Sequence, residues 1–187
     1  MPSRRSAPCA LVVAGLALLA CRSPQSLPPA QIVNVVDTVT LYALSGTPFT
    51  APSAYALAPT PQVIRTDQST GFDFAFNIDS IGEPVLLPGG ALGLPKDAGL
   101  QRSGSAFDAI ANAPTEGYVL DKPLVVSVGM VALARSRTQT CVDGTKVSLF
   151  SKLRVLAIDL SARTITFQIL VDQNCGYIGL APGLPPQ

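Results

Sequence analysis

Residues 71–78 carry an apolar side chain at every second position, and this alternation constrains the fold more than any other stretch. The apolar set is Phe72, Phe74, Phe76 and Ile78, and the residues between them are Asp73, Ala75 and Asn77. A period of two is typical of a β-strand with one buried face and one face toward water. Residues 63–66 and the turn-forming residues 67–71 predict that this strand closes a hairpin.

Further short strands are expected at 32–44, 85–87, 117–120, 123–136, 152–158 and 164–171. In the last of these, polar Thr164, Thr166 and Gln168 alternate with apolar residues, which indicates one face toward water. Seventeen prolines and fifteen glycines predict many turns and few long helices. The pattern predicts an all-β fold, either an antiparallel β-sandwich or a partly open barrel with one short helix.

The one short helix is expected over residues 106–113, where Ser105 and Asp108 match a capping box and Pro114 ends the helix. Residues 45–61 are interrupted by four prolines and predict an irregular connection. The side chains of this connection that we expect to pack onto the core are Phe49, Tyr55 and Leu57.

The N-terminus has the layout of an export signal. Arg4 and Arg5 precede an apolar run over residues 10–20, which is shorter than the about 20 residues that a membrane-spanning helix needs. The run ends in Leu18-Leu19-Ala20-Cys21, which resembles the lipobox of bacterial lipoprotein precursors. The alternative is an ordinary secretory signal that contains a cysteine.

The lipoprotein resemblance implies that the chain is cut before Cys21 and that this cysteine carries the lipid, including palmitate-type acyl chains. Arg22 is not the aspartate that tends to retain lipoproteins at the inner membrane. The implied location is therefore the cell envelope, lipid-anchored in the outer membrane on the periplasmic side. The expected organisation is a signal peptide at 1–20, a lipidated tether at 21–30, a single β domain at 31–175 and a Gly/Pro-rich surface tail at 176–187.

Composition limits the possible partners. Apolar residues make up 48% of the chain, which is enough to build a buried core. Without residues 1–20, the chain has 11 basic against 12 acidic residues, so no basic patch is indicated and nucleic acid is not an expected partner.

The cysteines beyond the signal region are few. Cys9 would leave with the signal and Cys21 would carry lipid, so Cys141 and Cys175 remain as a pair. A structural disulfide is the usual state of such a pair in an exported protein. A redox-active pair would more often have Cys-x-x-Cys spacing, which this pair lacks.

The sequence contains no histidine. This excludes a Ser-His-Asp triad, Cys-His catalysis and histidine-ligated zinc. A glycan hydrolase that uses two carboxylates stays open, because such enzymes need no histidine. The acidic pairs considered for that chemistry are Asp108 with Glu116 and Asp121 with Asp143.

Three further patterns have both a functional and an ordinary structural interpretation. Oxygen ligands for calcium are present in Asp67, Asp73, Asn77 and Asp79, but their spacing is not that of an EF-hand loop. Residues 88–93 have the glycine density of a phosphate-binding loop but lack its lysine, which favours a flexible loop. A basic strip could form from Arg135, Arg137, Lys146, Lys152 and Arg154, although a solvated sheet face has the same pattern.

No cofactor is expected, and no catalytic motif is recognisable in the sequence. The pattern favours a binding or assembly module that engages an envelope protein or polysaccharide through loops or a sheet edge. The alternatives are the carboxylate-dependent glycan hydrolase and a structural subunit of an envelope complex.

Overall fold

The computed structural model describes residues 27–186. The signal peptide at 1–20 and the lipid site at Cys21 lie outside the described residues. Over the described part of the chain, no helix is long and apolar enough to cross a membrane.

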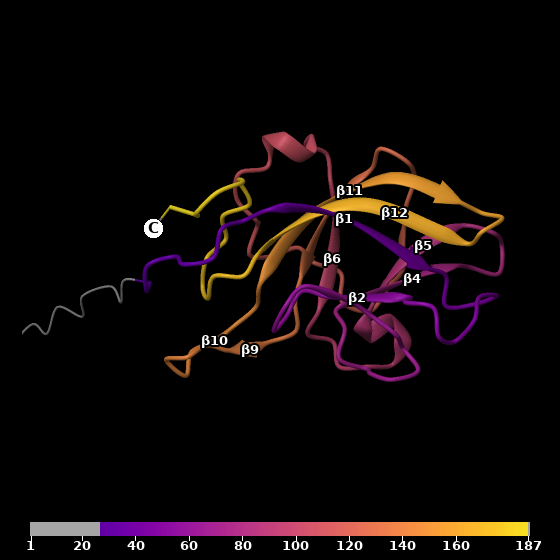
Figure 1. Ribbon diagram of the computed structural model, residues 1–187, viewed down its shortest axis with the longest axis horizontal. Coiled ribbons are helices and arrows are strands. Elements are labelled where there is room, and N and C mark those ends of the chain that lie inside the picture. The colour runs from indigo at the N-terminus through magenta and orange to yellow at the C-terminus, as the bar shows by residue number, and fades with distance from the viewer. Residues whose placement is uncertain (1–26, 187) are drawn as a thin grey trace, which may run out of the picture.

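The molecule is an antiparallel β-sandwich, which confirms the all-β prediction (Figure 1). The strands are β1 (Val36–Tyr42), β2 (Ala54–Ala56), β3 (Gln62–Ile64), β4 (Phe74–Ile78), β5 (Pro84–Pro88), β6 (Gly99–Ser103), β7 (Leu124–Val125), β8 (Val131–Arg135), β9 (Gln139–Thr140), β10 (Lys146–Val147), β11 (Phe150–Asp159) and β12 (Thr164–Asp172). The first sheet has the order β1-β12-β11-β8-β6, and the second has the order β3-β2-β4-β5-β7. Strands β9 and β10 form a separate small hairpin.

The main core lies between the two sheets and is almost entirely aliphatic and aromatic. The rings of Tyr55, Phe74 and Phe167 meet at its centre, with centroids 5.7–6.2 Å apart. Burial of such side chains is the main favourable contribution to folding, at about 25 cal/mol per Å² of apolar surface. The alternation along β12 is as predicted, because Ile165, Phe167 and Ile169 are buried, whereas Thr166 and Gln168 between them are partly exposed.

Two smaller apolar clusters cover the outer faces of the sheets. On the first sheet, residues 107–113 and the C-terminal segment pack over Leu133, Phe150 and Leu170. On the second sheet, Phe72 packs with Ala54 and Ala75. Both faces of β4 are therefore buried, so the prediction that Asp73 and Ala75 face water is wrong.

The predicted hairpin of residues 63–78 is wrong as well. Strand β2 lies between β3 and β4 and pairs with both, so these two strands are not neighbours. Strand β6 was not expected, because its residues lie in a glycine-rich stretch. Gly99 is needed in this strand because the side chain of Tyr118 lies where a Cβ would be, at 2.8 Å.

The expected helix at 106–113 is a single 3₁₀ turn at Phe107–Ala109. No side chain caps its start, and the amide of Ala113 bonds instead to Ile178 in the C-terminal segment. That segment is not a surface tail, since Tyr177 and Leu180 are buried.

The expectation that Phe49 packs onto the core is also wrong, because its side chain is 85% exposed.

Candidate functional site at the edge of strand β1

Strand β1 is an edge of the first sheet and bonds to β12 on one side only. Ala43 directs its N–H toward the β11–β12 turn, whereas Asn34 and Tyr42 direct theirs the opposite way, to Gly183 and Pro52. Because N–H directions alternate along an antiparallel strand, Val36, Thr38 and Thr40 direct their backbone groups away from β12 as well. Within residues 27–186, the stretch Val36–Thr40 is therefore an open sheet edge.

The apolar side chains of β1 and of the residues just before it form one row, and part of this row extends past the region that the second sheet covers. Val39 and Leu41 are buried between the sheets. Val33 and Val35 follow the same alternation on the preceding residues, yet they are 51% and 66% exposed. Exposed apolar side chains that extend a core are typical of a contact surface.

A shallow groove of about 260 Å³ lies beside these valines, between strands β1 and β12 of the first sheet and strand β2 of the second. Its apolar walls include Val33 and Val35 together with Ile169 and Val171 of β12. Tyr55 of β2 reaches it from the second sheet, and Asp37 is the one charged residue among those that line it. Burial, and then the negative charge of Asp37, raise the pKa of the Tyr55 hydroxyl to about 12.

Asp37 also protects the open edge. Its carboxylate Oδ1 accepts the Thr38 N–H at 2.7 Å, and this N–H is one of the outward-facing donors. A charged side chain on an edge strand opposes indiscriminate pairing with other chains. A strand that binds here would need to displace this weak local contact.

A second hollow, of about 370 Å³, runs along β3. It is lined in part by Val63, Ile64 and Arg65, and Arg65 pairs with Asp67 at 2.7 Å. This hollow has no equivalent of the apolar strip that leads into the core from β1. The groove at β1 is therefore the stronger candidate.

The four residues considered as calcium ligands are held by separate partners. Asp67 binds Arg65, Asn77 accepts the Ser45 N–H, and Asp79 accepts the amides of Ile81 and Glu83. Asp73 is buried against Arg137. Within residues 27–186, no three acidic or cysteine side chains gather as a metal site would require.

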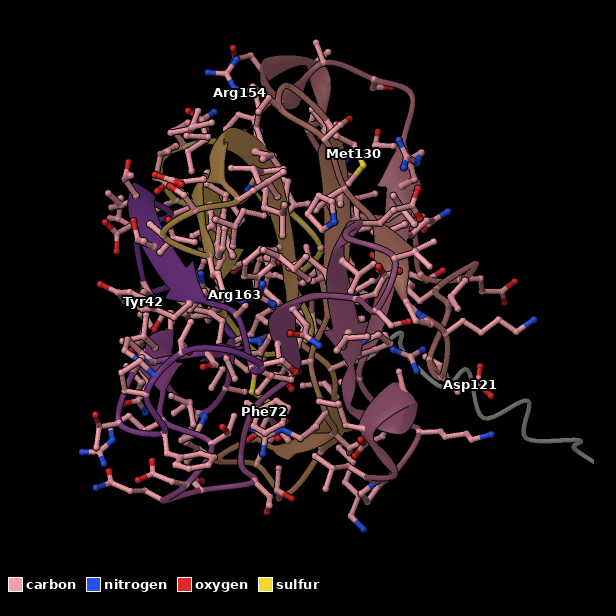
Figure 2. The ribbon with its side chains drawn as sticks, turned by 90° about the vertical axis from the view of Figure 1, so that its right-hand side faces the viewer. Tyr42, Phe72, Asp121, Met130, Arg154 and Arg163 are labelled. Carbon is pink, nitrogen blue, oxygen red and sulfur yellow. A yellow bond between two sulfur atoms is a disulfide. The ribbon has the colours of Figure 1, made fainter. Side chains whose placement is uncertain are left out.

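Of the two acidic pairs considered for hydrolysis, Asp121 and Asp143 lack the raised pKa of a general acid. The hydrogen bond from Lys96 lowers the pKa of Asp121, and the Thr145 amide lowers that of Asp143. A general acid needs a raised pKa instead. Asp121 lies at the periphery of the molecule (Figure 2).

The predicted basic strip is divided between different environments. Arg135, Lys152 and Arg154 lie on the outer face of the first sheet, near the rings of Tyr118 and Phe107. Lys152 is buried and donates to the carbonyls of Phe107 and Ile110, each at 2.9 Å. Desolvation lowers the pKa of this lysine. Lys152 therefore holds the 3₁₀ segment rather than forming part of an exposed strip.

Residues 88–93 do not form a strand–loop–helix phosphate site. They contain the end of β5 and a four-residue 3₁₀ turn at Gly89–Leu92. A Cβ on Gly90 would clash with the Leu120 carbonyl oxygen, so this glycine allows close packing of two loops.

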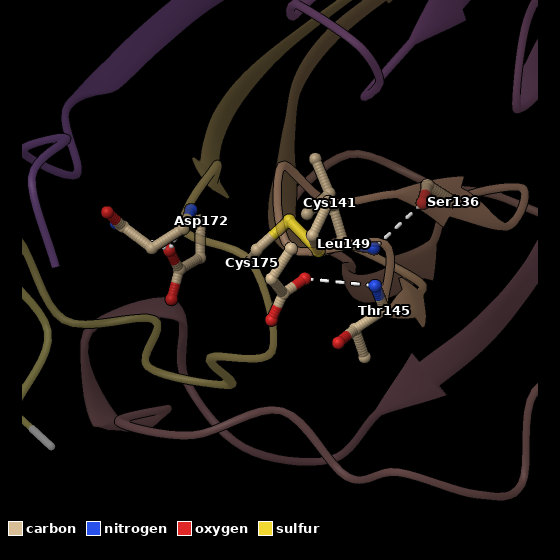
Figure 3. Close-up of a disulfide and its surroundings, with 8 residues drawn as sticks. Ser136, Cys141, Thr145, Leu149, Asp172 and Cys175 are labelled. Atoms are coloured by element: carbon tan, nitrogen blue, oxygen red, sulfur yellow. Dashed lines mark hydrogen bonds between the residues drawn. A yellow bond between two sulfur atoms is a disulfide. The ribbon is translucent and has the colours of Figure 1, made fainter. Parts of the chain in front are cut away.

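The predicted disulfide is present. Cys141 and Cys175 are joined, which ties the β9–β10 hairpin to the chain just after β12 (Figure 3). Asp172 lies close to Cys175 in the same view. The bond therefore holds the β9–β10 hairpin against the segment that follows β12.

Sequence reasoning included Val33 and Val35 in a strand but missed their exposure. The signal that could have found it is the largely apolar run Ile32-Val33-Asn34-Val35-Val36, which begins three residues after Pro29 of the tether. No protein-family model matches the sequence, and no curated protein matches it either.

Proposed function

We propose that the protein is an envelope lipoprotein, anchored through Cys21 in the outer membrane and facing the periplasm, that binds an extended segment of a partner polypeptide along β1. The observation that carries the proposal is the exposed apolar strip of Val33 and Val35 beside an open strand edge. Strand addition of this kind uses backbone hydrogen bonds for affinity and side-chain grooves for specificity.

The chain itself already makes one such contact on this edge. Gly183 forms two backbone hydrogen bonds with Asn34, at 2.9 and 3.0 Å, and these two residues form an isolated antiparallel bridge. The C-terminal segment therefore occupies the Asn34 end of the edge. No described residue pairs with the outer side of Val36–Thr40, so we propose that the partner binds there.

The groove sets the chemistry of the partner. Its walls are mainly small branched apolar side chains, so alternate residues of the bound segment should be small and apolar. Asp37 is the one charged lining residue, so a lysine or arginine of the partner should face it. These features favour a polypeptide over a polysaccharide as the occupant.

The position of the chain entry suits an anchored module. Asn174 accepts the amides of Gln31 and Ile32 and donates to the carbonyl of Ile32. This clasp fixes the point at which a tether from Cys21 would reach the domain. The groove begins at the next residue, Val33, so the bound partner would lie close to the membrane.

Two experiments test the two parts of the proposal. Membrane fractionation of cells that express Cys21→Ala tests the anchor: the variant should become soluble, and continued membrane association would reject it. A photo-crosslinking residue at position 35 or 128, in native membranes, tests the groove. Val35 and Val128 are similarly exposed, at 66% and 63%, so position 128 is the matched control.

Position 35 should crosslink to one defined polypeptide, and position 128 should not. Asp37→Lys should abolish that crosslink, because it reverses the charge that faces the partner. Equal crosslinking from both positions, or a crosslink that is insensitive to Asp37→Lys, would reject the groove as the binding site.

A further inference from the structure

The C-terminal segment has two parts that are attached to the sandwich in different ways. The first part ends at Leu180, which is fully buried and donates its N–H to the carbonyl of Ala111 at 2.7 Å. The second part, residues 181–186, is mostly exposed, and we call it the strap. Every hydrogen bond that the strap makes within residues 27–186 is with Asn34. The strap is therefore attached mainly at one point of the β1 edge.

The contacts of the strap are few. Gly183 exchanges two backbone hydrogen bonds with Asn34, at 2.9 and 3.0 Å, and the Asn34 side chain donates to the carbonyl of Ala181 at 3.3 Å. Pro185 is buried and packs closely over Gly179. Two backbone hydrogen bonds of ordinary net strength favour the closed strap by a factor of only about 5–150. A competing segment can overcome a preference of this size.

The composition of the strap prevents it from forming a longer ladder with the edge. The antiparallel bridge between Asn34 and Gly183 places Pro185 opposite Ile32. Proline has no N–H and cannot donate to a strand, and the strap has three prolines, at positions 182, 185 and 186. A segment with an N–H at each outward position can pair with Asn34 and also with Val36. Such a segment would make more hydrogen bonds on this edge than the strap does.

The exposed valines of the groove lie on both sides of the position that the strap holds. Val33 is 51% exposed and Val35 is 66% exposed, and both line the groove. Asn34 stands between them in the chain. A bound strand that covers both valines must therefore occupy the place beside Asn34 where Gly183 now lies.

The edge has fixed limits on either side of this stretch. Asn174 bonds to both the amide and the carbonyl of Ile32, and Tyr42 donates its N–H to Pro52. We propose, on the basis of the binding mode proposed above, that the strap is a built-in competitor of the partner polypeptide. The partner displaces Gly183 from Asn34 and pairs along the whole of residues 33–40.

Amide hydrogen exchange of the purified protein, with its disulfide intact, tests whether the strap opens by itself. After correction for intrinsic exchange, the Asn34 and Gly183 amides should be protected at least about tenfold less than the Leu180 amide. Equal protection of the three amides would mean that the strap leaves the edge only together with its buried anchor. That result would overturn the proposal, and it needs no partner and no variant.

Gly183→Pro releases the strap without shortening the chain. The substitution removes the N–H that bonds to Asn34, and proline cannot adopt the φ of 103° found at this position. Gly82→Pro is the matched control, because Gly82 has a φ of 86° and donates its N–H to Asp79 in the β4–β5 turn. A Cβ at either glycine would meet no atom within 4 Å. Unchanged protection of the Leu180 amide shows that each variant is folded.

Photo-crosslinking from positions 33 and 35 in native membranes then tests the competition. Position 33 should crosslink to the same polypeptide as position 35, and Gly183→Pro should raise the yield from position 33 at least about fivefold when the partner is not saturating. Gly82→Pro should leave this yield unchanged.

The outcomes separate this proposal from the binding mode on which it rests. Crosslinking from position 35 but not from position 33, or equal yields in Gly183→Pro and Gly82→Pro, would overturn the strap as a competitor and leave the groove as the binding site. The absence of any crosslink from both positions would overturn the binding mode, and the competition with it.

Discussion

The Asp73 carboxylate and the Arg137 guanidinium, 64 residues apart in the chain, form an ion pair in which Asp73 is almost completely buried. Asp73 Oδ1 also accepts the backbone N–H of Arg137, and its Oδ2 accepts the Leu57 N–H. Arg137 in turn donates to the carbonyl of Ala58. The pair therefore joins β2, the start of β4 and the chain that leaves β8.

Asp73→Ala should lower the free energy of unfolding by about 3–5 kcal/mol, because it leaves the Arg137 charge and two backbone amides without their acceptor. Chemical denaturation measures this loss. Asp67→Ala is the matched control, since it breaks an exposed Asp–Arg pair and should cost no more than about 1 kcal/mol. If the two variants lose the same free energy of unfolding, the buried pair stabilises the fold no more than the exposed one.

Lys152→Ala should destabilise the protein by about 2–4 kcal/mol, because the Phe107 and Ile110 carbonyls lose a charged donor and the buried side chain leaves a cavity. Backbone exchange should also increase in the 3₁₀ segment. Lys146→Ala, at an exposed position of β10, should change stability by less than about 0.5 kcal/mol. Thermal unfolding of the two variants provides the comparison.

Removal of the disulfide by Cys141→Ser with Cys175→Ser should cost about 4 kcal/mol in the chain-entropy model, given a sequence separation of 34 residues. The fold should persist at 25 °C, because both main sheets form without the β9–β10 hairpin. Denaturant titration and circular dichroism check the two statements. Unchanged stability would mean that the hairpin stays in place without the bond.

The Tyr55 hydroxyl should make the protein sensitive to alkali. Its pKa is raised from 10.0 to about 12 in the folded state, so its contribution to stability is intact below pH 10 and is lost as the pH rises toward 12. Tyr55→Phe should remove about 3 kcal/mol of this alkaline loss. Tyr42→Phe, which removes the hydroxyl of an exposed tyrosine on β1, is the control variant.

The sequence predicts a strand correctly when only one of its faces is buried, and a hairpin correctly when its two strands are adjacent in the chain. Strand β12 alternates as it does because one face meets the core, and the β11–β12 hairpin is formed by adjacent segments. The prediction for β4 was wrong because the other face of this strand is also buried, where Ala75 packs with Phe72 and Ala54 in a second cluster. The position of β2 between β3 and β4 is set by packing, which the local pattern does not encode.

The candidate site could be predicted only in part. The alternation along residues 32–44 predicted a strand that included Val33 and Val35, whereas strand β1 begins at Val36. Their exposure depends on how far the second sheet extends beneath them, and that is a property of the assembled sandwich. Asp73 shows the reverse error. The alternation predicted that it faces water, but it is buried in an ion pair with Arg137, which lies 64 residues away in the chain.

Backbone amide exchange of β1 tests the central claim most directly, in the free domain and in its complex with the polypeptide that crosslinks to position 35. The amides of Val36 and Thr40 should exchange rapidly in the free protein and become protected at least about tenfold in the complex, since strand addition would supply their missing acceptors. If these amides exchange at the same rate in both states, the partner does not bind along the edge of β1, and the proposed mode of binding is wrong.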